Sequence, residues 1–464
     1  MNKSSGEPID LRQNITGPED VEEYLNATPR FAKKSTLTDL RKYLKRFGDP
    51  QKGMKIIHVA GTNGKGSVSS QIGSCLREAG FHTGLFTSPH LTDIRERMTV
   101  DGEMIPEDRF TGLFSTVLTE VLKAEEDGLS HPLYFEFLFL MAMLWFSEKK
   151  PDYVILETGV GGRLDATNSV EDKVMTVITR IGLDHTLYLG NTIPEIASEK
   201  AGILRKGCPA VFLCEPAEAC AVIKEKAEEV GAPVYEVSRQ SWRVNRADEN
   251  GIDFSLYNSY DKNLRIFLPG RALYQCENAA LAAQAAGILL DAEGIHDPGI
   301  IQRGIEKNIW PGRLEEILPG VWIDGAHNPD GMRAFLESIR STAESCDRER
   351  AGTKRMLLFS CVRDKDYTNE LKMIAEYGLF TDIAAVPMRG GRALDAESLL
   401  RSVGEYAPGI TVHECDCVED AVNRFILNRN TDTEVYAAGS LYLVGEIRGL
   451  LQNNAETELP KVSK

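Results

Sequence analysis

The sequence predicts an α/β protein in which a large, mostly parallel sheet domain is followed by a smaller α/β domain. Two observations support this. Apolar runs of strand length alternate with helical patterns over most of the 464 residues, which is typical of parallel strands whose two faces are covered by helices. A stretch with Pro and Gly at residues 308–315 (NIWPGRLE) then interrupts the alternation, which restarts after it. We therefore expect domains over residues 1–310 and 311–464, since a chain of this length exceeds one compact core.

The first domain begins with residues 20–48, where apolar positions at helical spacing predict an N-terminal helical segment. The run KIIHVA, residues 55–60, predicts a buried strand that enters a glycine-rich turn, and residues 67–78 predict a helix after it. Between residues 242 and 268, short alternating segments around Asn250 and Gly251 predict antiparallel hairpins. The further strands are expected at residues 82–87, 153–157, 174–179 and 209–213, and the further helices at 195–204, 217–230 and 277–290.

The second domain repeats the alternation in a Rossmann-like order. Strands are expected at VWID (321–324), RMLLFS (355–360), DIAAV (382–386), ITVHE (410–414) and EVYAA (434–438), and helices after Pro329 and from Asp366, Asp395, Val418 and Leu441. This regular order predicts a second sheet of parallel strands.

Charge and composition exclude some partners. The formal net charge is −16, from 69 acidic and 53 basic residues, whereas a polyanion binder needs a dominant basic surface. We therefore expect no nucleic acid partner, although local basic sites for phosphate or carboxylate remain open. Residues 134–146 are the most apolar stretch, but they include Glu136 and are too few to span a bilayer.

The cysteines and the N-terminus point to the cytoplasm. Nine cysteines are scattered without CxxC pairs, so we expect reduced thiols, with neither a structural zinc site nor a disulfide framework. The first 20 residues lack the apolar core of a signal peptide. We expect a cytoplasmic, monomeric protein that does not bind membranes.

The strongest local signal is HVAGTNGKGS, residues 58–67. A strand that ends in glycines before a helix directs backbone N–H groups and the helix N-terminus at an anion, and Lys65 adds a mobile positive charge. The segment departs from the general P-loop pattern G-x-x-x-x-G-K-[ST], since Val59 takes the place of the first glycine and Gly66 follows the lysine. It predicts a P-loop that binds phosphates; the alternative is a turn whose glycines only pack.

Polar side chains follow the ends of three predicted strands. Glu157 ends one strand, and Ser88 and His185 lie just beyond two others. Because parallel strands bring their carboxyl ends to one edge of a sheet, where ligands bind, a carboxylate there can hold Mg²⁺ that bridges nucleotide phosphates. Taken singly, the serine is also compatible with a plain turn, and the histidine with a structural role.

The loop GTNGKGS closely resembles the nucleotide loop of the folylpolyglutamate and dihydrofolate synthases of the Mur-ligase superfamily. Further motifs resemble those of the same family and occur in the same order: TSPHL with RERM, LETGVGGRLDATN, ITRIGLDH, SEKAGI, ENAALA, PGRLE and DGAHNP. The resemblance covers roughly residues 38 to 330 by specific motifs and the remainder by general pattern.

The resemblance implies the following site. ATP is contacted by the glycine-rich loop and by three later residues, namely Gly61, Thr62, Asn63, Gly64, Lys65, Gly66, Ser67, Asn278, Arg313 and Asp324. One Mg²⁺ is held by Ser88 and Glu157, and a second one by His185. The pterin or carboxylate substrate is bordered by Arg163 and Asp165. It also implies that Lys200 is carbamylated and supports the second Mg²⁺, whereas an exposed ion pair with Glu195 or Glu199 is the alternative. His327 contacts the acyl phosphate or the incoming amino acid, or only stabilises its turn.

The implied reaction is the ATP-dependent addition of L-glutamate to a folate-type carboxylate. Transfer of the γ-phosphoryl group makes an acyl phosphate, and the amine of glutamate then attacks it. The protein mainly aligns the ligands and neutralises charge, which suits the catalytic candidates Lys65, His185, Lys200, Arg313 and His327.

Two other functions are compatible with parts of the sequence. One is a Mur-type ligase that adds an amino acid to a UDP-linked cell-wall precursor, although only 54 residues precede the P-loop strand. The other is an ATP-binding regulatory protein without ligase activity. The sequence leaves open whether dihydropteroate, tetrahydrofolate or both are accepted, and how many glutamates are added.

Overall fold

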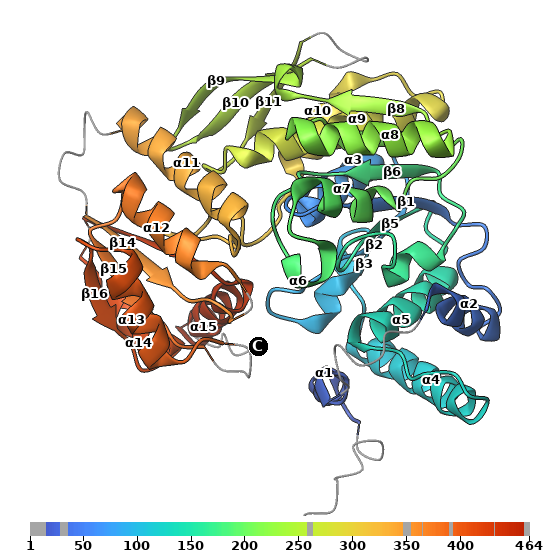
Figure 1. Ribbon diagram of the computed structural model, residues 1–464, viewed down its shortest axis with the longest axis horizontal. Helices are drawn as coiled ribbons and strands as arrows, with labels where there is room; N and C mark the ends of the chain where they lie inside the picture. Colours follow the sequence, from blue (N-terminus) through green and yellow to red (C-terminus); the bar gives the residue numbers. More distant parts are fainter. Residues whose placement is uncertain are drawn as a thin grey trace, which may run out of the picture.

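The computed structural model describes residues 15–27, 36–257, 263–346, 354–363, 365–388, 393–430 and 432–458. These residues form three sheets of eight, three and six strands. The first sheet and its helices occupy the right of Figure 1, the six-stranded sheet and its helices occupy the left, and the three-stranded sheet lies at the top. The two large sheets are the two predicted α/β units.

The eight-stranded sheet has the order β4-β3-β2-β5-β1-β6-β7-β8. Its strands are β1 (Lys55–Ala60), β2 (Thr83–Phe86), β3 (Met98–Val100), β4 (Glu103–Met104), β5 (Tyr153–Glu157), β6 (Met175–Ile178), β7 (Ala210–Leu213) and β8 (Val234–Val237). The strands β2, β5, β1, β6, β7 and β8 are neighbours in that order and pair in parallel. Strands β3 and β4 add an antiparallel edge next to β2. The sheet is therefore mostly parallel, as the sequence predicts.

Helices cover both faces of this sheet, because successive residues of its central strands point to opposite sides. Ile57 and Val59 pack with side chains of α3, α9 and α10, while Ile56 and Leu156 pack with those of α1, α2, α4 and α5. The helices are α1 (Pro18–Ala27), α2 (Leu37–Arg46), α3 (Lys65–Glu78), α4 (Glu107–Glu126), α5 (Tyr134–Lys149), α6 (Thr186–Leu189), α7 (Ile193–Ala201), α8 (Ala217–Val230), α9 (Tyr274–Ala292) and α10 (Pro298–Lys307), with 3-10 turns η1 (Ile94–Arg97), η2 (Ala166–Ser169) and η3 (Arg239–Ser241).

The three-stranded sheet is antiparallel, as the Asn-Gly turn predicts. It consists of β9 (Trp242–Asp248), β10 (Gly251–Leu256) and β11 (Leu264–Leu268) in the order β11-β10-β9. Its buried face shares a core with α3, α9 and α10, so this sheet extends the first unit.

The six-stranded sheet has the order β12-β13-β17-β14-β15-β16 and is parallel apart from β12. Its elements are β12 (Glu315–Leu318), β13 (Val321–Ile323), α11 (Pro329–Cys346), β14 (Lys354–Phe359), α12 (Tyr367–Tyr377), β15 (Asp382–Ala385), α13 (Ala396–Tyr406), β16 (Thr411–Glu414), α14 (Val418–Ala421), the π-helical η4 (Val422–Leu427), β17 (Thr433–Ala438) and α15 (Leu441–Glu458). All its strands follow residue 314, in agreement with the restart of the pattern seen in the sequence.

The structure adds elements that the sequence reading did not predict. Helices α4 and α5 form a pair whose apolar side chains join the core beneath the first sheet, so the apolar stretch at residues 134–146 is a buried helix. Among the described residues, no helix has the length and apolar character needed to cross a membrane. Two stretches lie outside the described residues. They are residues 1–14, which include most of the stretch considered for a signal peptide, and residues 28–35 of the predicted N-terminal helical segment.

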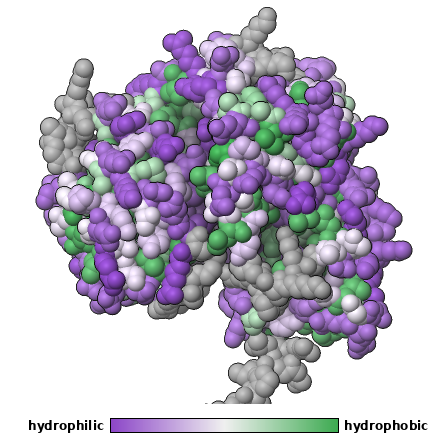
Figure 2. All heavy atoms as spheres, in the orientation of Figure 1, coloured by the Kyte–Doolittle hydropathy of each residue, from purple (hydrophilic) through white to green (hydrophobic). Residues whose placement is uncertain are grey.

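Two details of the sequence reading are wrong. Helix α9 begins at Tyr274, earlier than the predicted start at residue 277. Cys214 and Cys220 form a disulfide, whereas reduced thiols were expected throughout; six other described cysteines are free thiols. Hydrophilic side chains predominate on the face in Figure 2, and hydrophobic ones form small groups there.

Candidate active site

A cavity of about 1110 Å³ lies between the two α/β units. Its walls come from loops that follow parallel strands: the loops after β1, β2, β5, β6 and β7 on one side, and those after β13, β14 and β17 on the other. Its volume exceeds that of an ordinary site for one small ligand. The predicted site residues that line it are Gly61, Thr62, Asn63, Gly64, Lys65, Gly66, Ser67, Ser88, Glu157, Asp165, His185, Lys200, Asn278, Arg313, Asp324 and His327.

The glycine-rich loop connects β1 to α3 along the floor of the cavity. The backbone N–H groups of Thr62 and Asn63 donate to the carbonyl oxygen of Arg180, at 2.8 and 3.3 Å. Gly64 has a φ of +86°, and a Cβ there would lie 2.3 Å from Oδ1 of Asn278. The close approach of α9 therefore requires glycine at residue 64, and the N–H groups of the first turn of α3 are left for a ligand.

Lys65 and Glu157 lie side by side at the centre of the cavity. Nζ of Lys65 donates to the carbonyl oxygen of Thr62 at 3.2 Å and lies 3.9 Å from Oε1 of Glu157. The backbone N–H of Ser88 donates to Oε2 of Glu157 at 3.2 Å. Burial raises the pKa of Glu157 to about 7, although the nearby Lys65 cation opposes this shift. A buried carboxylate with so few donors is suited to binding a cation.

His185 is the N-cap residue directly before the short helix α6, and its backbone is left-handed, with a φ of +50°. Burial lowers the pKa of His185 to about 4, against the effect of Asp184, so the ring is neutral at pH 7. A neutral imidazole keeps a lone pair for a metal ion. The position of His185 is therefore compatible with the predicted metal ligand.

Lys200 is buried in α7 and does not form the exposed ion pair that was the alternative. Its Nζ donates to the carbonyl oxygen of Gly61 at 2.7 Å, while Glu199 pairs with Arg163. Burial, reinforced by the Lys65 cation, lowers the pKa of Lys200 to about 7. A substantial fraction of this amine is thus uncharged near neutral pH.

Asp324 and Arg313 lie in the second unit and line the cavity. Asp324 accepts hydrogen bonds from Tyr274 Oη at 2.5 Å and from the backbone N–H groups of Leu314 and Ala326, each at 2.8 Å. Burial raises the pKa of Asp324, although the Tyr274 hydroxyl and the Arg313 cation oppose the shift. Oδ2 thus holds the backbone at Leu314 and Oδ1 holds that at Ala326, and a contact with ribose stays a prediction.

His327 lies in the turn after β13. Its Nδ1 is 2.7 Å from the carbonyl oxygen of Gly325, and its Nε2 is 3.8 Å from Oδ2 of Asp184. Burial lowers the pKa of His327 to about 4, and the Lys365 cation acts in the same direction. A neutral ring held at Nδ1 leaves Nε2 facing the cavity wall formed by Asp184.

The two predicted substrate-binding residues differ in position. The carboxylate of Asp165 accepts from the backbone N–H groups of Gly159, Val160 and Thr167, at 2.9 to 3.1 Å, so it holds the loop that lines the cavity. Arg163 is about half exposed, pairs with Glu199 at 2.7 Å and is absent from the cavity wall. Its contact with substrate stays a prediction.

Three residues at the junction of the two units were missed. Lys365 forms an ion pair with Asp184, and Nδ2 of Asn328 donates to Asp184 at 3.1 Å and to Oδ1 of Asn63 at 3.0 Å. Asp184 and Asn328 lie inside recognised motifs, LDH and HNP, so the motifs could have identified them. Lys365 lies in RDKD, which is unremarkable without the fold.

Comparison with known proteins gives a consistent result. No family model matches the chain. It is 35% identical over 447 residues to the dihydrofolate synthase/folylpolyglutamate synthase of Bacillus subtilis, covering 94% of this chain and 100% of the relative. The solved structure "E.coli FolC in complex with DHPP and ADP" superposes with a TM-score of 0.80 at 29% identity, covering 95% of this chain and 99% of that one.

A third similar protein contains a nucleotide analogue and a metal ion. The bifunctional folylpolyglutamate synthase/dihydrofolate synthase of Yersinia pestis, complexed with AMPPNP and a Mn ion, superposes with a TM-score of 0.78 at 28% identity. The match covers 94% of this chain and 98% of that one. These similarities extend over both units.

The close approach at Gly64 makes a testable prediction about stability. We expect Gly64→Ala to lower the free energy of unfolding by about 3 kcal/mol, since a left-handed backbone and a collision with Asn278 add. The matched control is Gly80→Ala, where φ is +91° and no heavy atom lies within 4 Å of the added Cβ; backbone strain alone costs about 1 kcal/mol. Urea denaturation measures both, and equal losses would contradict the packing argument.

Proposed function

Because the chain belongs to the folylpolyglutamate synthase/dihydrofolate synthase family, we propose that its cavity holds ATP, a folate-type acid and L-glutamate together. The protein is an ATP-dependent ligase that adds glutamate to folates. The observation that carries the detailed proposal is the position of Lys65 beside the buried Glu157, under loops from both units. The proposal extends to both acids, dihydropteroate and tetrahydrofolate, since the Bacillus subtilis relative bears both names.

We assign the triphosphate of ATP to the glycine-rich loop. The Lys65 amine donates to the carbonyl oxygen of Thr62 and lies 3.9 Å from Glu157, so few contacts within the described residues keep it from following the phosphates. The helix α3 adds the positive end of its dipole at the same point. Asn278 borders the loop next to Gly64 and is assigned to the nucleoside.

A divalent cation fits the residues beside the loop. We assign Ser88 and Glu157 to one Mg²⁺ and His185 to a second, since the three line the same cavity and the carboxylate is buried with few donors. When bound, magnesium neutralises the charge on the phosphates. The nucleotide and metal in the Yersinia pestis structure support this assignment.

The remaining residues act on the acid and the amine. Phosphoryl transfer to the acid gives an acyl phosphate, and attack of the glutamate amine on it releases phosphate and forms the amide. Arg313 lies at the junction of the units and supplies a positive charge to the departing phosphate. His327, neutral and held by Gly325, is assigned to orient the amine or the acyl phosphate. Both units exclude water from this intermediate.

Other sequence predictions are carried forward as proposals. We assign residues 1–310 to the ATP-binding domain, a P-loop type of sheet domain, and residues 311–464 to a Rossmann-like domain. Arg163 and Asp165 are assigned to the border of the acid site. A cytoplasmic location and a monomeric state complete the proposal.

The direct test offers the purified protein ATP, Mg²⁺ and glutamate together with dihydropteroate or tetrahydrofolate. We expect each acid to gain glutamate, with one ADP formed per amide bond, as read by mass spectrometry and a coupled ADP assay. Failure of one acid would overturn the proposed dual use, and ATP hydrolysis without amide formation would overturn the coupling of the two steps.

Replacement of Lys65 tests the phosphate assignment. We expect Lys65→Ala to lower kcat by about 100-fold or more, because one charge that stabilises the transferring phosphoryl group is removed. The control is Lys52→Ala, which removes an exposed lysine paired only with Asp49 and leaves kcat unchanged. Equal unfolding midpoints establish that both variants fold. A Lys65→Ala enzyme with the wild-type kcat would show that the loop has been misread.

Carbamylation of Lys200 is proposed because CO₂ reacts with an uncharged amine. With a pKa of about 7, the uncharged fraction rises from about a tenth at pH 6 to about nine tenths at pH 8. We expect a carbamate resonance in ¹³C NMR that grows over this range at constant dissolved ¹³CO₂. It persists in Lys173→Arg, which changes another buried lysine, and vanishes in Lys200→Arg. A signal that survives in Lys200→Arg belongs to another amine.

A further inference from the structure

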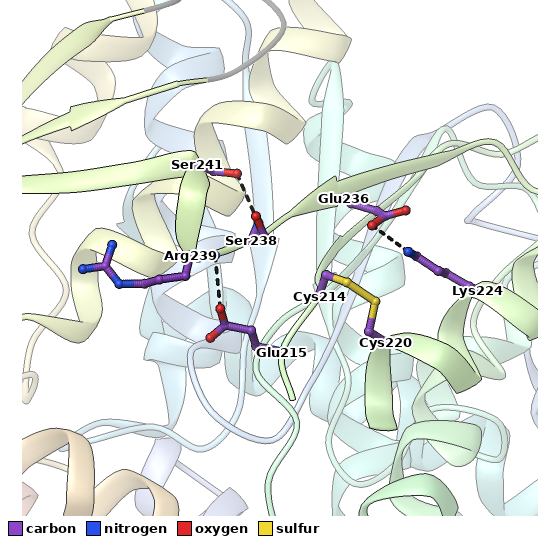
Figure 3. Close-up of a disulfide and its surroundings, with 8 residues drawn as sticks. All are labelled: Cys214, Glu215, Cys220, Lys224, Glu236, Ser238, Arg239 and Ser241. Atoms are coloured by element: carbon purple, nitrogen blue, oxygen red, sulfur yellow. Dashed lines mark hydrogen bonds and ion pairs between the residues drawn. A yellow bond between two sulfur atoms is a disulfide. The ribbon is translucent and has the colours of Figure 1, made fainter. Parts of the chain in front are cut away.

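The disulfide between Cys214 and Cys220 lies beside the cavity but outside the proposed catalytic groups. Cys214 follows the last residue of β7, and Cys220 lies in the first turns of α8, with a Cα–Cα distance of 4.6 Å (Figure 3). The intervening loop contains Glu215, which lines the cavity. The disulfide therefore closes a small covalent ring around a cavity residue.

Glu215 connects this ring to the opposite wall. Its Oε1 accepts from the backbone N–H of Arg239 at 3.1 Å, a contact drawn in Figure 3, and its Oε2 lies 3.5 Å from Nη2 of Arg180. Arg239 also lines the cavity. The carboxylate is thus held between a backbone donor and a cation.

Arg180 continues the connection to the nucleotide end. Its guanidinium is ion-paired with Glu277, the neighbour of Asn278 in α9, and its carbonyl oxygen accepts from the N–H groups of Thr62 and Asn63. Movement of Glu215 therefore changes the charge facing Arg180, the residue that anchors the glycine-rich loop.

The two ends of this loop are held by the core as well as by the disulfide, because Ala219 and Cys220 are buried in a core cluster against which Cys214 packs. The backbone N–H of Cys214 donates to the carbonyl oxygen of Val237 at 2.7 Å, and that of Cys220 donates to Pro216 at 3.1 Å. Residues 217 and 218 between them are exposed. Lys224 and Glu236, 2.8 Å apart, join α8 to β8 nearby but lie beyond the ring. Breaking the sulfur–sulfur bond removes one covalent restraint on the segment that carries Glu215, whose carboxylate keeps its contacts with Arg239 and Arg180.

The pair is also chemically distinct from the other described cysteines. Cys214 is partly exposed, whereas five of the six free thiols among the described residues are buried. In the part of the chain that the structure describes, one local disulfide beside these free thiols is typical of a redox-responsive pair and untypical of a disulfide framework.

We propose that Cys214 and Cys220 are a reversible thiol–disulfide site that tunes nucleotide affinity through Glu215 and Arg180. The partner reagent is a low-molecular-weight disulfide of the glutathione class. One cysteine thiolate attacks that disulfide and releases one thiol; the second cysteine then displaces the other thiol as the protein disulfide forms. The two protein thiols lose two electrons and two protons, and the reagent gains them as two thiols. The effect on ATP rests on the proposed function, whereas the effect on ADP binding requires only a nucleotide site.

The test compares the whole protein after oxidised glutathione and after dithiothreitol, with the redox state of Cys214 and Cys220 established by alkylation and peptide mass spectrometry. We expect the oxidised form to bind ADP about threefold more tightly by calorimetry, the gain of one partly exposed ion pair. The KM for ATP falls by the same factor and kcat does not change. Loss of ligase activity in both forms would refute the proposed function and leave the binding result intact.

Three variants test whether the disulfide changes nucleotide affinity through Glu215. Cys214→Ser with Cys220→Ser abolishes the response, Cys208→Ser preserves it, and Glu215→Gln forms the disulfide but shows no change in affinity. A wild-type protein that stays reduced, or whose affinity is the same in both forms, overturns the proposal. So does a full response in Glu215→Gln.

A metal ion must be distinguished from the thiol chemistry. The two sulfurs and a carboxylate oxygen of Glu236 lie within 4.8 Å of one another, a set that a thiophilic cation such as Zn²⁺ can bind once the thiols are free. The assays are therefore repeated with a zinc-selective chelator. A response that disappears with the chelator identifies a metal switch and overturns the disulfide proposal; an unchanged response supports it.

Discussion

The buried ion pair between Asp184 and Lys365 holds the two α/β units in register at the site. Asp184 follows β6 and Lys365 follows β14, so the pair joins the edges of two separate sheets. Burial alone would raise the pKa of Asp184, but the cation of Lys365, with His327 and His185, lowers it below its usual value. Because an unpaired buried charge is costly, each member fixes the other, and the amide of Asn328 completes the contact with Asn63.

This junction explains the charges left inside the cavity. Burial lowers the pKa of Lys200, and the cations of Lys65 and Lys365, which line the same cavity, lower it further. Two histidines beside them are held neutral by burial. Lys65 and Lys365 thus place positive charge at the cavity wall, which suits the anionic substrates that we propose.

Local patterns were sufficient to predict most strands, the glycine-rich loop and the residues at strand ends, because each depends on neighbours in the sequence. The family resemblance favoured the folate ligase over the cell-wall and regulatory alternatives, and the relatives confirm the folate branch. Lys365 and the Cys214–Cys220 pair could not be found in this way. Lys365 meets Asp184 across 181 residues, and the two cysteines meet only because the chain reverses between β7 and α8. Both depend on the folded chain.

The departure of the loop from the general P-loop pattern also has a physical cause. Val59 replaces a glycine because it is fully buried within β1, paired with Glu157 and Val177, so the turn begins only at Gly61. Gly66 replaces Ser or Thr because a Cβ there would lie 2.9 Å from the ring of Trp310, the last residue before the second unit. Helix α3, to which we assign the phosphates, is thus packed against the junction of the two units. If the phosphates bind there, nucleotide binding is linked to the relative position of the units.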